Sequence, residues 1–205
     1  NRGYRREAGE APVRESVAAG LVMSSNWKPG RMMVDPFCGA GTILIEAALI
    51  AAGRLPRNMK RGFAFQNLKN FEKAKWPAPE PVSEPESPMF FGYDVDGGVI
   101  EIAKRNAQSA GVGKWIHFEK RDMRQVTAPA TEGVLLTNPP YGERLEDTER
   151  AKKLFDEFSS VLKTQFKGWD AWILSGNKDA IAGLRLKASR RIPIWNGPIE
   201  CRLLH

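Results

Sequence analysis

Short apolar segments alternate with longer amphipathic segments along this chain, and this alternation restricts the fold more than any other feature. Strands are expected at residues 32–34, 89–93, 115–119, 133–137 and 169–174, and helices at 13–26, 42–52, 96–110 and 147–166. Residues 184–191 and 199–204 are expected to pair as a closing antiparallel hairpin. The sequence therefore predicts an α/β fold with a mostly parallel seven-stranded sheet and helices on both faces.

A polar residue follows four of the expected strands, namely Asp35, Asp94, Asp122 and Asn138. In parallel sheets of this kind, ligands bind at the carboxyl ends of the strands. Polar side chains at four such ends indicate one shared site rather than unrelated surface positions.

The composition is that of a globular protein with a basic charge balance. Of the 205 residues, 42% are hydrophobic, and the formal net charge is +7. This charge suits a polyanionic partner, and it equally suits a mildly basic enzyme that binds none. No apolar run approaches the roughly 20 residues of a membrane-spanning helix, and the start of the chain does not read as a signal peptide.

The cysteine and histidine content predicts neither a disulfide scaffold nor a metal site. Cys38 and Cys201 lack metal-site spacing, and His117 and His205 are expected to be structural or surface groups. Cys38 is expected to be a small packing residue rather than a nucleophile. Two cysteines in 205 residues fit a reducing cytosol, so a cytoplasmic location is expected.

Residues 1–205 are expected to form a single domain, interrupted by a Pro-rich surface insertion at residues 77–88. The chain begins at Asn1 without an initiator methionine, so we expect it to be a fragment of a longer protein. The stretch from Arg54 to Lys75 is basic and is the candidate RNA surface.

A glycine-containing turn follows the first strand, in the run Asp35-Pro36-Phe37-Cys38-Gly39-Ala40-Gly41-Thr42. Gly39 and Gly41 allow a sharp turn and a close approach to a ligand, although a plain tight turn would use them too. Leu44 stands where a dinucleotide fingerprint needs a third glycine, and the Gly-Lys-Ser/Thr of a Walker loop is absent. A carboxylate before the turn would repel a phosphate but suits a ligand with an amino group.

Asp94 is placed to accept hydrogen bonds from two ribose hydroxyls, since one carboxylate can accept both. The alternative role is the N-cap of the following helix, which Asp96 fills better. Asp122 could bind an adenine amino group while Met123 packs on the ring. A simple turn role for Asp122 is an equally good interpretation.

The run Asn138-Pro139-Pro140-Tyr141 carries the strongest functional signal in the sequence. The two prolines fix the backbone and remove two donors, which leaves the Asn138 side-chain oxygen and the Pro139 carbonyl as acceptors. This pair can hold both hydrogens of an NH2 group, and Tyr141 offers a face on which a base can stack. A Pro-Pro-Tyr turn or a polyproline ligand is the competing interpretation.

With these residues in place, the chain resembles the class I methyltransferases that carry an Asn-Pro-Pro-Tyr motif. More narrowly, it resembles the catalytic domain of the family that joins an N-terminal THUMP domain to an RNA guanine-N2 methyltransferase. Bacterial members acting on 23S ribosomal RNA are the most similar. The resemblance rests on Arg2 to Arg5, Ala11 to Glu15 with Ala18 and Ala19, Asp35 to Thr42, Phe63 to Phe65, Thr137 to Leu145, and Asn196 to Leu203.

The resemblance implies a Rossmann-like class I fold, S-adenosylmethionine as cofactor, and ribosomal RNA as partner. It implies methyl transfer to the N2 amine of a guanosine at Asn138, Pro139, Pro140 and Tyr141. The implied cofactor-binding residues are Asp35, Pro36, Cys38, Gly39, Gly41, Thr42, Asp94, Asp122, Met123 and Asn138. The THUMP domain of the family is expected upstream of this chain.

Other functions satisfy the same motif chemistry. Adenine-N6 DNA methyltransferases and protein glutamine methyltransferases also hold an amine or amide in this way. A non-catalytic RNA-binding module that kept the fold is a further alternative. The choice of RNA rests on the family resemblance and on the basic stretch.

Overall fold

The computed structural model describes residues 3–4, 13–54, 83–140 and 145–205 of the chain, and the side chains of 145–148 are excluded. Tyr141, residues 77–82 of the Pro-rich segment, and all of the basic stretch after Arg54 lie outside these ranges. None of the helices in the described part combines the length and the apolar character that crossing a bilayer requires.

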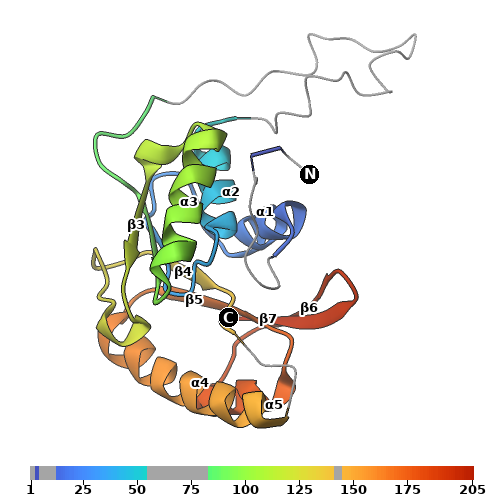
Figure 1. The fold of residues 1–205 in the computed structure, drawn as a ribbon. Coiled ribbons are helices and arrows are strands. Elements are labelled where there is room, and N and C mark those ends of the chain that lie inside the picture. The colour runs from blue at the N-terminus through green and yellow to red at the C-terminus, as the bar shows by residue number, and fades with distance from the viewer. Residues whose placement is uncertain (1–2, 5–12, 55–82, 141–144) are drawn as a thin grey trace, which may run out of the picture.

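One twisted sheet forms the centre of the molecule (Figure 1). Its strand order is β3-β2-β1-β4-β5-β7-β6, and β7 alone runs in the direction opposite to the other six strands. The strands are β1 (Met33–Asp35), β2 (Phe90–Asp94), β3 (Ile116–Lys120), β4 (Val134–Thr137), β5 (Asp170–Ser175), β6 (Arg191–Asn196) and β7 (Ile199–Leu204). The mostly parallel sheet with a C-terminal antiparallel hairpin, expected from the sequence, is confirmed.

Helices cover both faces of this sheet (Figure 1). On one face lie α1 (Glu15–Ser24), α2 (Thr42–Ala51) and α3 (Gly97–Ala110), and on the other α4 (Leu145–Gln165) and α5 (Lys178–Ile181). Short 3-10 turns are η4 (Gly113–Trp115), η5 (Met123–Gln125) and η6 (Ala182–Leu184). The helix starts and ends agree closely with those expected from the apolar spacing.

The core consists of two apolar layers, one on each side of the sheet. Strand residues alternate between them, as a pleated strand requires. Leu136 joins the layer under α1 to α3, whereas Leu135 joins the layer under α4. Helix α4 contributes Phe155 and Phe158, both fully buried, from the apolar face that its sequence spacing predicts. The packed sheet therefore fixes the positions of the strand ends.

The expected first strand of the closing hairpin, residues 184–191, is wrong. Strand β6 begins only at Arg191, whereas Leu184 ends η6 and Arg185 has a left-handed φ of 45°. The alternating pattern after Leu184 imitates a strand, and Pro193 makes the true strand look unsuitable. Proline is tolerated there because β6 is the edge strand, where one side of the backbone has no partner strand.

Candidate active site

Backbone and side-chain hydrogen bonds join the carboxyl ends of β3, β2, β1 and β4 into one continuous cluster. The Arg121 amide donates to the Asp94 carbonyl at 2.9 Å, which ties the end of β3 to the end of β2. The Asp94 carboxylate accepts from the Gly39 amide at 3.1 Å. Asp35 then accepts from Thr137 at the end of β4. Asp35 and Asp94 are the last residues of β1 and β2, Asn138 directly follows β4, and Asp122 comes two residues after β3.

The turn after β1 contains two glycines with left-handed backbone, and at one of them a side chain would also collide with β3. Gly39 and Gly41 have left-handed φ values of 52° and 80°. A Cβ on Gly41 would lie 2.6 Å from the Phe118 ring, so this glycine permits close packing on β3. A Cβ on Gly39 would meet nothing within 4 Å, so the space beside it is open. The buried Asn106 amide donates to the Ala40 carbonyl at 3.2 Å and holds the turn against α3.

Asp35 is 1% exposed and lies beneath this turn. Its Oδ1 accepts hydrogen bonds from Thr137 Oγ1 at 2.5 Å and from the Phe37 amide at 3.1 Å. Burial raises the pKa of Asp35 from 3.8 to about 7, against the opposing effect of these two bonds. The structure thus gives Asp35 a bracing role between β1 and β4 that the sequence did not indicate, and contact with a cationic ligand stays a prediction.

Asp94 is partly exposed, and its two oxygens are oriented by backbone amides. Oδ2 accepts from Gly39 and Oδ1 accepts from Asp96 at 3.0 Å. Asp96 caps α3, because its side chain accepts from the Gly98 amide at 2.7 Å. The division of roles expected from the sequence is confirmed for the cap. Val95, which the sequence interpretation passed over, is 62% exposed between them and gives the site an apolar face.

Asp122 follows β3 and is engaged by its neighbour Arg124. Its Oδ1 accepts from the Arg124 amide at 2.8 Å, and its Oδ2 pairs with the Arg124 guanidinium at 2.7 Å. The same guanidinium also bonds Glu157 on α4. Met123 is only 2% exposed and packs in the core. The turn role of Asp122 is therefore present, and contact with an adenine ring stays a prediction for both residues.

Asn138 follows Thr137 directly, and its Oδ1 is buried without a hydrogen-bond partner among the described residues. A buried amide oxygen without a partner costs free energy, so it marks a position that a ligand donor can satisfy. Pro139 is buried and Pro140 is exposed. The predicted stacking residue Tyr141 lies outside the described residues.

The remaining residues expected to hold the cofactor surround the turn and are largely buried. Pro36, Cys38 and Thr42 all have little exposed surface. Burial, with smaller contributions from the charges of Asp35 and Asp94, raises the pKa of the Cys38 thiol, which agrees with a packing role. Thr42 begins α2, whose first turn is not capped by a side chain within the described ranges. Its free N–H groups are therefore available near the turn.

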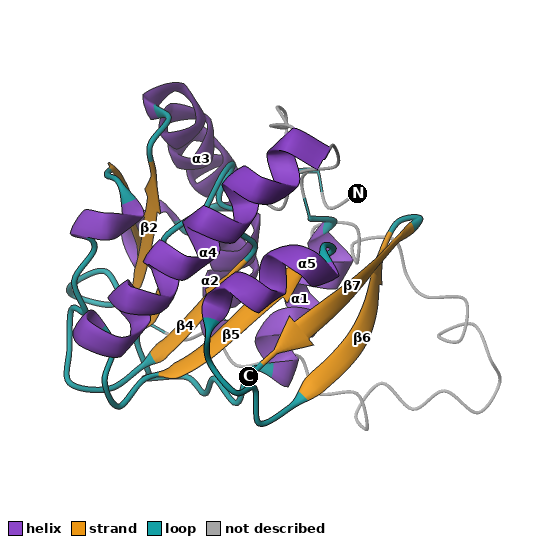
Figure 2. Ribbon diagram, turned by 90° about the horizontal axis from the view of Figure 1, so that it is seen from below, coloured by secondary structure: helices purple, strands orange, loops and turns teal. Residues whose placement is uncertain are grey.

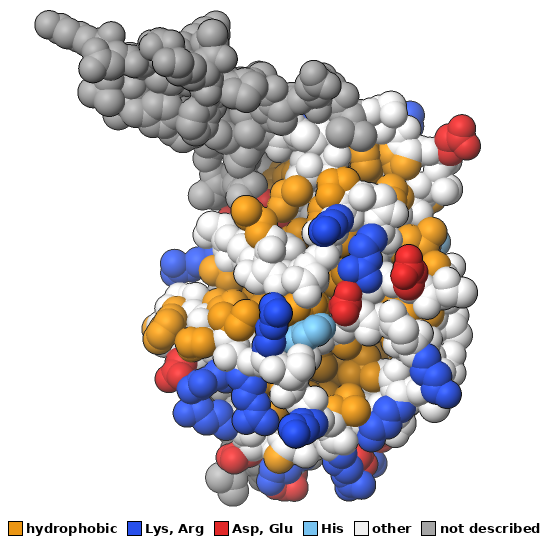
Figure 3. Space-filling view, turned by 180° about the vertical axis from the view of Figure 1, so that it is seen from behind, with side chains coloured by type: hydrophobic (Ala, Val, Ile, Leu, Met, Phe, Trp, Pro, Cys, Tyr) orange, Lys and Arg blue, Asp and Glu red, His pale blue; other side chains and the backbone are white. Residues whose placement is uncertain are grey.

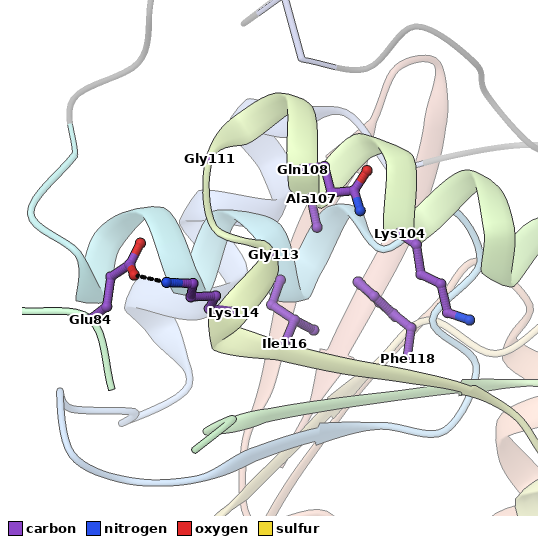
Figure 4. Close-up of a pocket in the computed structure, with 9 residues that line it drawn as sticks. All are labelled: Glu84, Lys104, Ala107, Gln108, Gly111, Gly113, Lys114, Ile116 and Phe118. Atoms are coloured by element: carbon purple, nitrogen blue, oxygen red, sulfur yellow. Dashed lines mark hydrogen bonds and ion pairs between the residues drawn. The ribbon is translucent and has the colours of Figure 1, made fainter. Parts of the chain in front are cut away.

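A separate open cleft of about 380 Å³ lies between α3 and β3. Figure 4 shows Phe118, Ile116 and Ala107 lining it, with an ion pair between Glu84 and Lys114 at one end. None of the four strand-end residues lines this cleft, so it is distinct from the candidate site. Within the described ranges, no group of three or more His, Cys, Asp or Glu side chains could hold a metal ion.

The fold and this cluster define a class I methyltransferase, and comparison with known proteins identifies the family. Residues 2–205 match the family model UPF0020, described as the RMKL-like methyltransferase domain. The chain therefore belongs to the RMKL-like methyltransferase domain family.

Curated relatives in this family are much longer than the chain. The ribosomal RNA large subunit methyltransferase K/L of Shewanella frigidimarina is 39% identical over 209 residues, covering 98% of this chain and 29% of the relative. The protein of the same name from Photobacterium profundum is 39% identical over 212 residues, covering 98% and 30%. The chain thus spans about three tenths of the length of these relatives.

Solved structures confirm the fold class. A protein described as a possible methylase of Clostridium difficile superposes with a TM-score of 0.85 at 35% identity, covering 100% of this chain and 54% of its own. SMU.472, solved with SAH, gives 0.83 at 32% identity, covering 100% and 54%. A Listeria monocytogenes protein named as a predicted N6-adenine-specific DNA methylase gives 0.81 at 34%, covering 100% and 53%. The neighbour that holds SAH, the product of S-adenosylmethionine, agrees with the expected cofactor.

Proposed function

We propose that this domain transfers a methyl group from S-adenosylmethionine to the N2 amine of a guanosine in RNA, with 23S ribosomal RNA as the substrate. The observation that carries the proposal is the buried Asn138 Oδ1 at the end of β4, which has no hydrogen-bond partner among the residues that the structure describes. Asn138 directly follows Thr137, which is hydrogen-bonded to Asp35 in the cluster described above. The names of the curated relatives support ribosomal RNA as the substrate class.

The residues of the cluster fit the cofactor in chemical kind. Open space beside Gly39 and the uncapped start of α2 leave room and donors for its methionine carboxylate. The partly exposed Asp94 carboxylate suits the ribose hydroxyls, and the exposed Val95 side chain suits an apolar face of the adenine. Asp122, which follows β3, is the acceptor that we assign to the adenine amino group.

When bound, the cofactor supplies an activated methyl group on a sulfonium. The part of the protein is to present the acceptor nitrogen. Asn138 Oδ1 and the Pro139 carbonyl accept the two N–H bonds of the amine, which favours a pyramidal nitrogen with its lone pair directed at the methyl carbon. Positioning and electrostatics account for such catalysis without a strong base, because the proton can leave after transfer.

The charge of the chain is compatible with a nucleic acid as the substrate. The net charge is +7, and Figure 3 shows many Lys and Arg side chains over the lower part of one face, with acidic side chains along its rim. Such a surface attracts polyanions in a salt-dependent way. One solved neighbour carries a DNA adenine methylase name, so adenine-N6 methylation is the second candidate.

We further propose that the full-length protein carries additional domains, a THUMP domain among them, and works in the cytoplasm. The much greater length of the curated relatives supports additional domains. Residues 1–205 would then form its catalytic domain, with residues 77–88 as an insertion.

The test uses total RNA from a strain that lacks this enzyme. The full-length protein methylates this RNA with labelled cofactor, and nucleoside analysis follows. The expected product is N2-methylguanosine in 23S RNA. A matched reaction with duplex and single-stranded DNA serves as the comparison. Labelled N6-methyladenosine, or labelling of DNA alone, would contradict the proposal.

A further inference from the structure

The hairpin of β6 and β7 presents a large aromatic side chain that the proposed chemistry does not use. Trp195 on β6 is 61% exposed, although tryptophan is among the residues that proteins bury most. Its neighbours Ile192 and Ile194 pack against the core layer under α1. Because side chains alternate along a strand, Trp195 faces the opposite side of the sheet, the side of α4.

No helix of the described part of the chain covers this side of the hairpin. Figure 2 shows α4 and α5 lying across the central strands, with β6 beyond them. Trp195 pairs with Glu200 and Pro193 pairs with Arg202, so these four side chains share the open face. Arg202 donates to Glu200 at 3.0 Å, and its buried Nε has no partner in the described part of the chain.

The strand register shows that Trp195 lies beyond the carboxyl ends of the parallel strands, where the candidate site is. Thr137 is level with Ile173 on β5, which is level with Leu204 on β7 and, through it, with Arg191 on β6. Since β6 runs parallel to β4, Trp195 lies three residues further along than Asn138, or about 10 Å.

The hairpin therefore forms a wall beside the site. Three strand spacings of about 4.8 Å separate β6 from β4, so Trp195 lies roughly 17 Å from Asn138. A single strand stacked at about 3.4 Å per nucleotide spans this distance in about five nucleotides, and in fewer when extended. An RNA whose target base reaches Asn138 would thus have a nucleotide within about five positions of the target at the wall.

The position of the wall is fixed by its tip. Gly197 has a left-handed φ of 67°, which closes a tight turn between β6 and β7. The Arg14 amide donates to the Asn196 side chain at 3.5 Å, which connects the tip to the start of α1. A base can therefore stack on the exposed indole ring without a rearrangement of the hairpin backbone, which keeps the free-energy cost of ordering low.

We propose that Trp195 is a stacking platform for a base of the RNA substrate that lies within about five nucleotides of the one to be methylated. The inference rests on the proposed RNA methyltransferase function. Stacking on an aromatic ring suits any base, so the platform holds the strand in place without selecting its sequence. Arg191, exposed on the same face of β6, supplies a positive charge for the adjoining phosphate.

The test compares variants of the full-length protein on unmodified 23S ribosomal RNA. Trp195→Ala should raise the KM for RNA about tenfold or more, with cofactor affinity and the rate at saturating RNA unchanged. Trp195→Phe, which keeps a flat ring, should retain most RNA affinity. Trp195→Leu, which keeps apolar bulk only, should behave like Trp195→Ala. The matched control is Leu186→Ala, which removes another exposed apolar side chain, 45% exposed. Leu186 lies before the start of β6, whereas Trp195 lies near its end.

Salt dependence separates stacking from charge. The loss in Trp195→Ala should be the same at low and high salt, whereas a lost phosphate contact would change the slope. An unchanged KM for RNA, or wild-type behaviour of Trp195→Leu, would overturn the platform. A changed oligomeric state with unchanged RNA affinity would assign Trp195 to a protein interface instead. If the wild-type protein methylates no RNA, the proposed function itself fails, which is a distinguishable result.

Discussion

Thr137 Oγ1 donates a hydrogen bond of 2.5 Å to the buried Oδ1 of Asp35, and this bond joins the glycine turn after β1 to the end of β4. The residue after Thr137 is Asn138, whose amide oxygen is expected to hold the methyl acceptor. The bond therefore connects the proposed cofactor-binding turn to the proposed transfer residue. Both sides of the reaction would be positioned by one buried contact.

Asp35 should make folding stability depend on pH. Its carboxyl has a pKa of about 7 in the folded state and 3.8 as the ordinary value, so the folded protein holds a proton between these values that the unfolded chain has lost. Stability therefore falls as pH rises through this window. The free energy of unfolding of Asp35→Asn, minus that of wild type, should increase by about 2–3 kcal/mol from pH 5 to pH 8.

Chemical denaturation of both proteins across that range measures this difference, and shared titrations of other groups cancel in it. A constant difference between pH 5 and pH 8 would show that Asp35 stays ionised throughout.

Thr137→Val should destabilise the domain by about 1–3 kcal/mol, because Asp35 loses its side-chain donor while remaining buried. Thr137→Ser keeps the hydroxyl and should stay close to wild type. Thermal unfolding of the pair gives the comparison. A loss in Thr137→Ser as large as that in Thr137→Val would contradict the role of the hydroxyl, because the serine variant keeps the hydroxyl and lacks only the methyl group.

Asn138→Ala should lower the methyl-transfer rate by about 100-fold or more, since one positioned polar group in an active site contributes on this scale. Its Oδ1 has no partner within the described ranges, so folding stability should change little. Single-turnover kinetics, calorimetric cofactor binding and a melting curve cover the three properties. Loss of folding or of cofactor affinity alone would argue against a role in holding the acceptor amine.

Asp94→Ala should weaken cofactor binding about tenfold or more, because a charged group bonded to ribose hydroxyls contributes about 1.5–3 kcal/mol. Asp96→Ala is the matched control. It removes the cap of α3 at a cost of about 1 kcal/mol and should leave cofactor affinity intact. Calorimetry with S-adenosylmethionine decides between them, and equal affinities in the two variants would contradict the assignment of Asp94.

Gly41→Ala should cost about 2–4 kcal/mol of stability, from the left-handed backbone and from a Cβ 2.6 Å from the Phe118 ring. Gly39→Ala meets no atom within 4 Å and should cost only about 1–2 kcal/mol. Gly39→Ala should nevertheless lower the affinity for the cofactor, since its Cβ would occupy the open space beside the turn. Adding Phe118→Leu should restore part of the lost stability in the Gly41→Ala variant but not in the Gly39→Ala variant. Restored stability in both variants would contradict the packing argument.

The sequence predicted the mostly parallel sheet, its four longer helices and the place of the candidate site. Apolar runs of strand length between amphipathic helices have one favourable arrangement, and the side chain after each strand must then lie at the same edge. Asp35, Asp94, Asp122 and Asn138 could be selected on this ground alone. The division between Asp94 and Asp96 could be predicted because capping depends on local spacing.

Tertiary structure alone decided the features that depend on neighbours distant in sequence. Asp35 and Thr137 are 102 residues apart along the chain, so no local pattern indicates their bond. The true position of β6 depended on its place at the edge of the sheet, where Pro193 is tolerated. The exposure of Trp195 followed from the same cause, because a sheet edge that extends past its helices leaves one face of the strand uncovered.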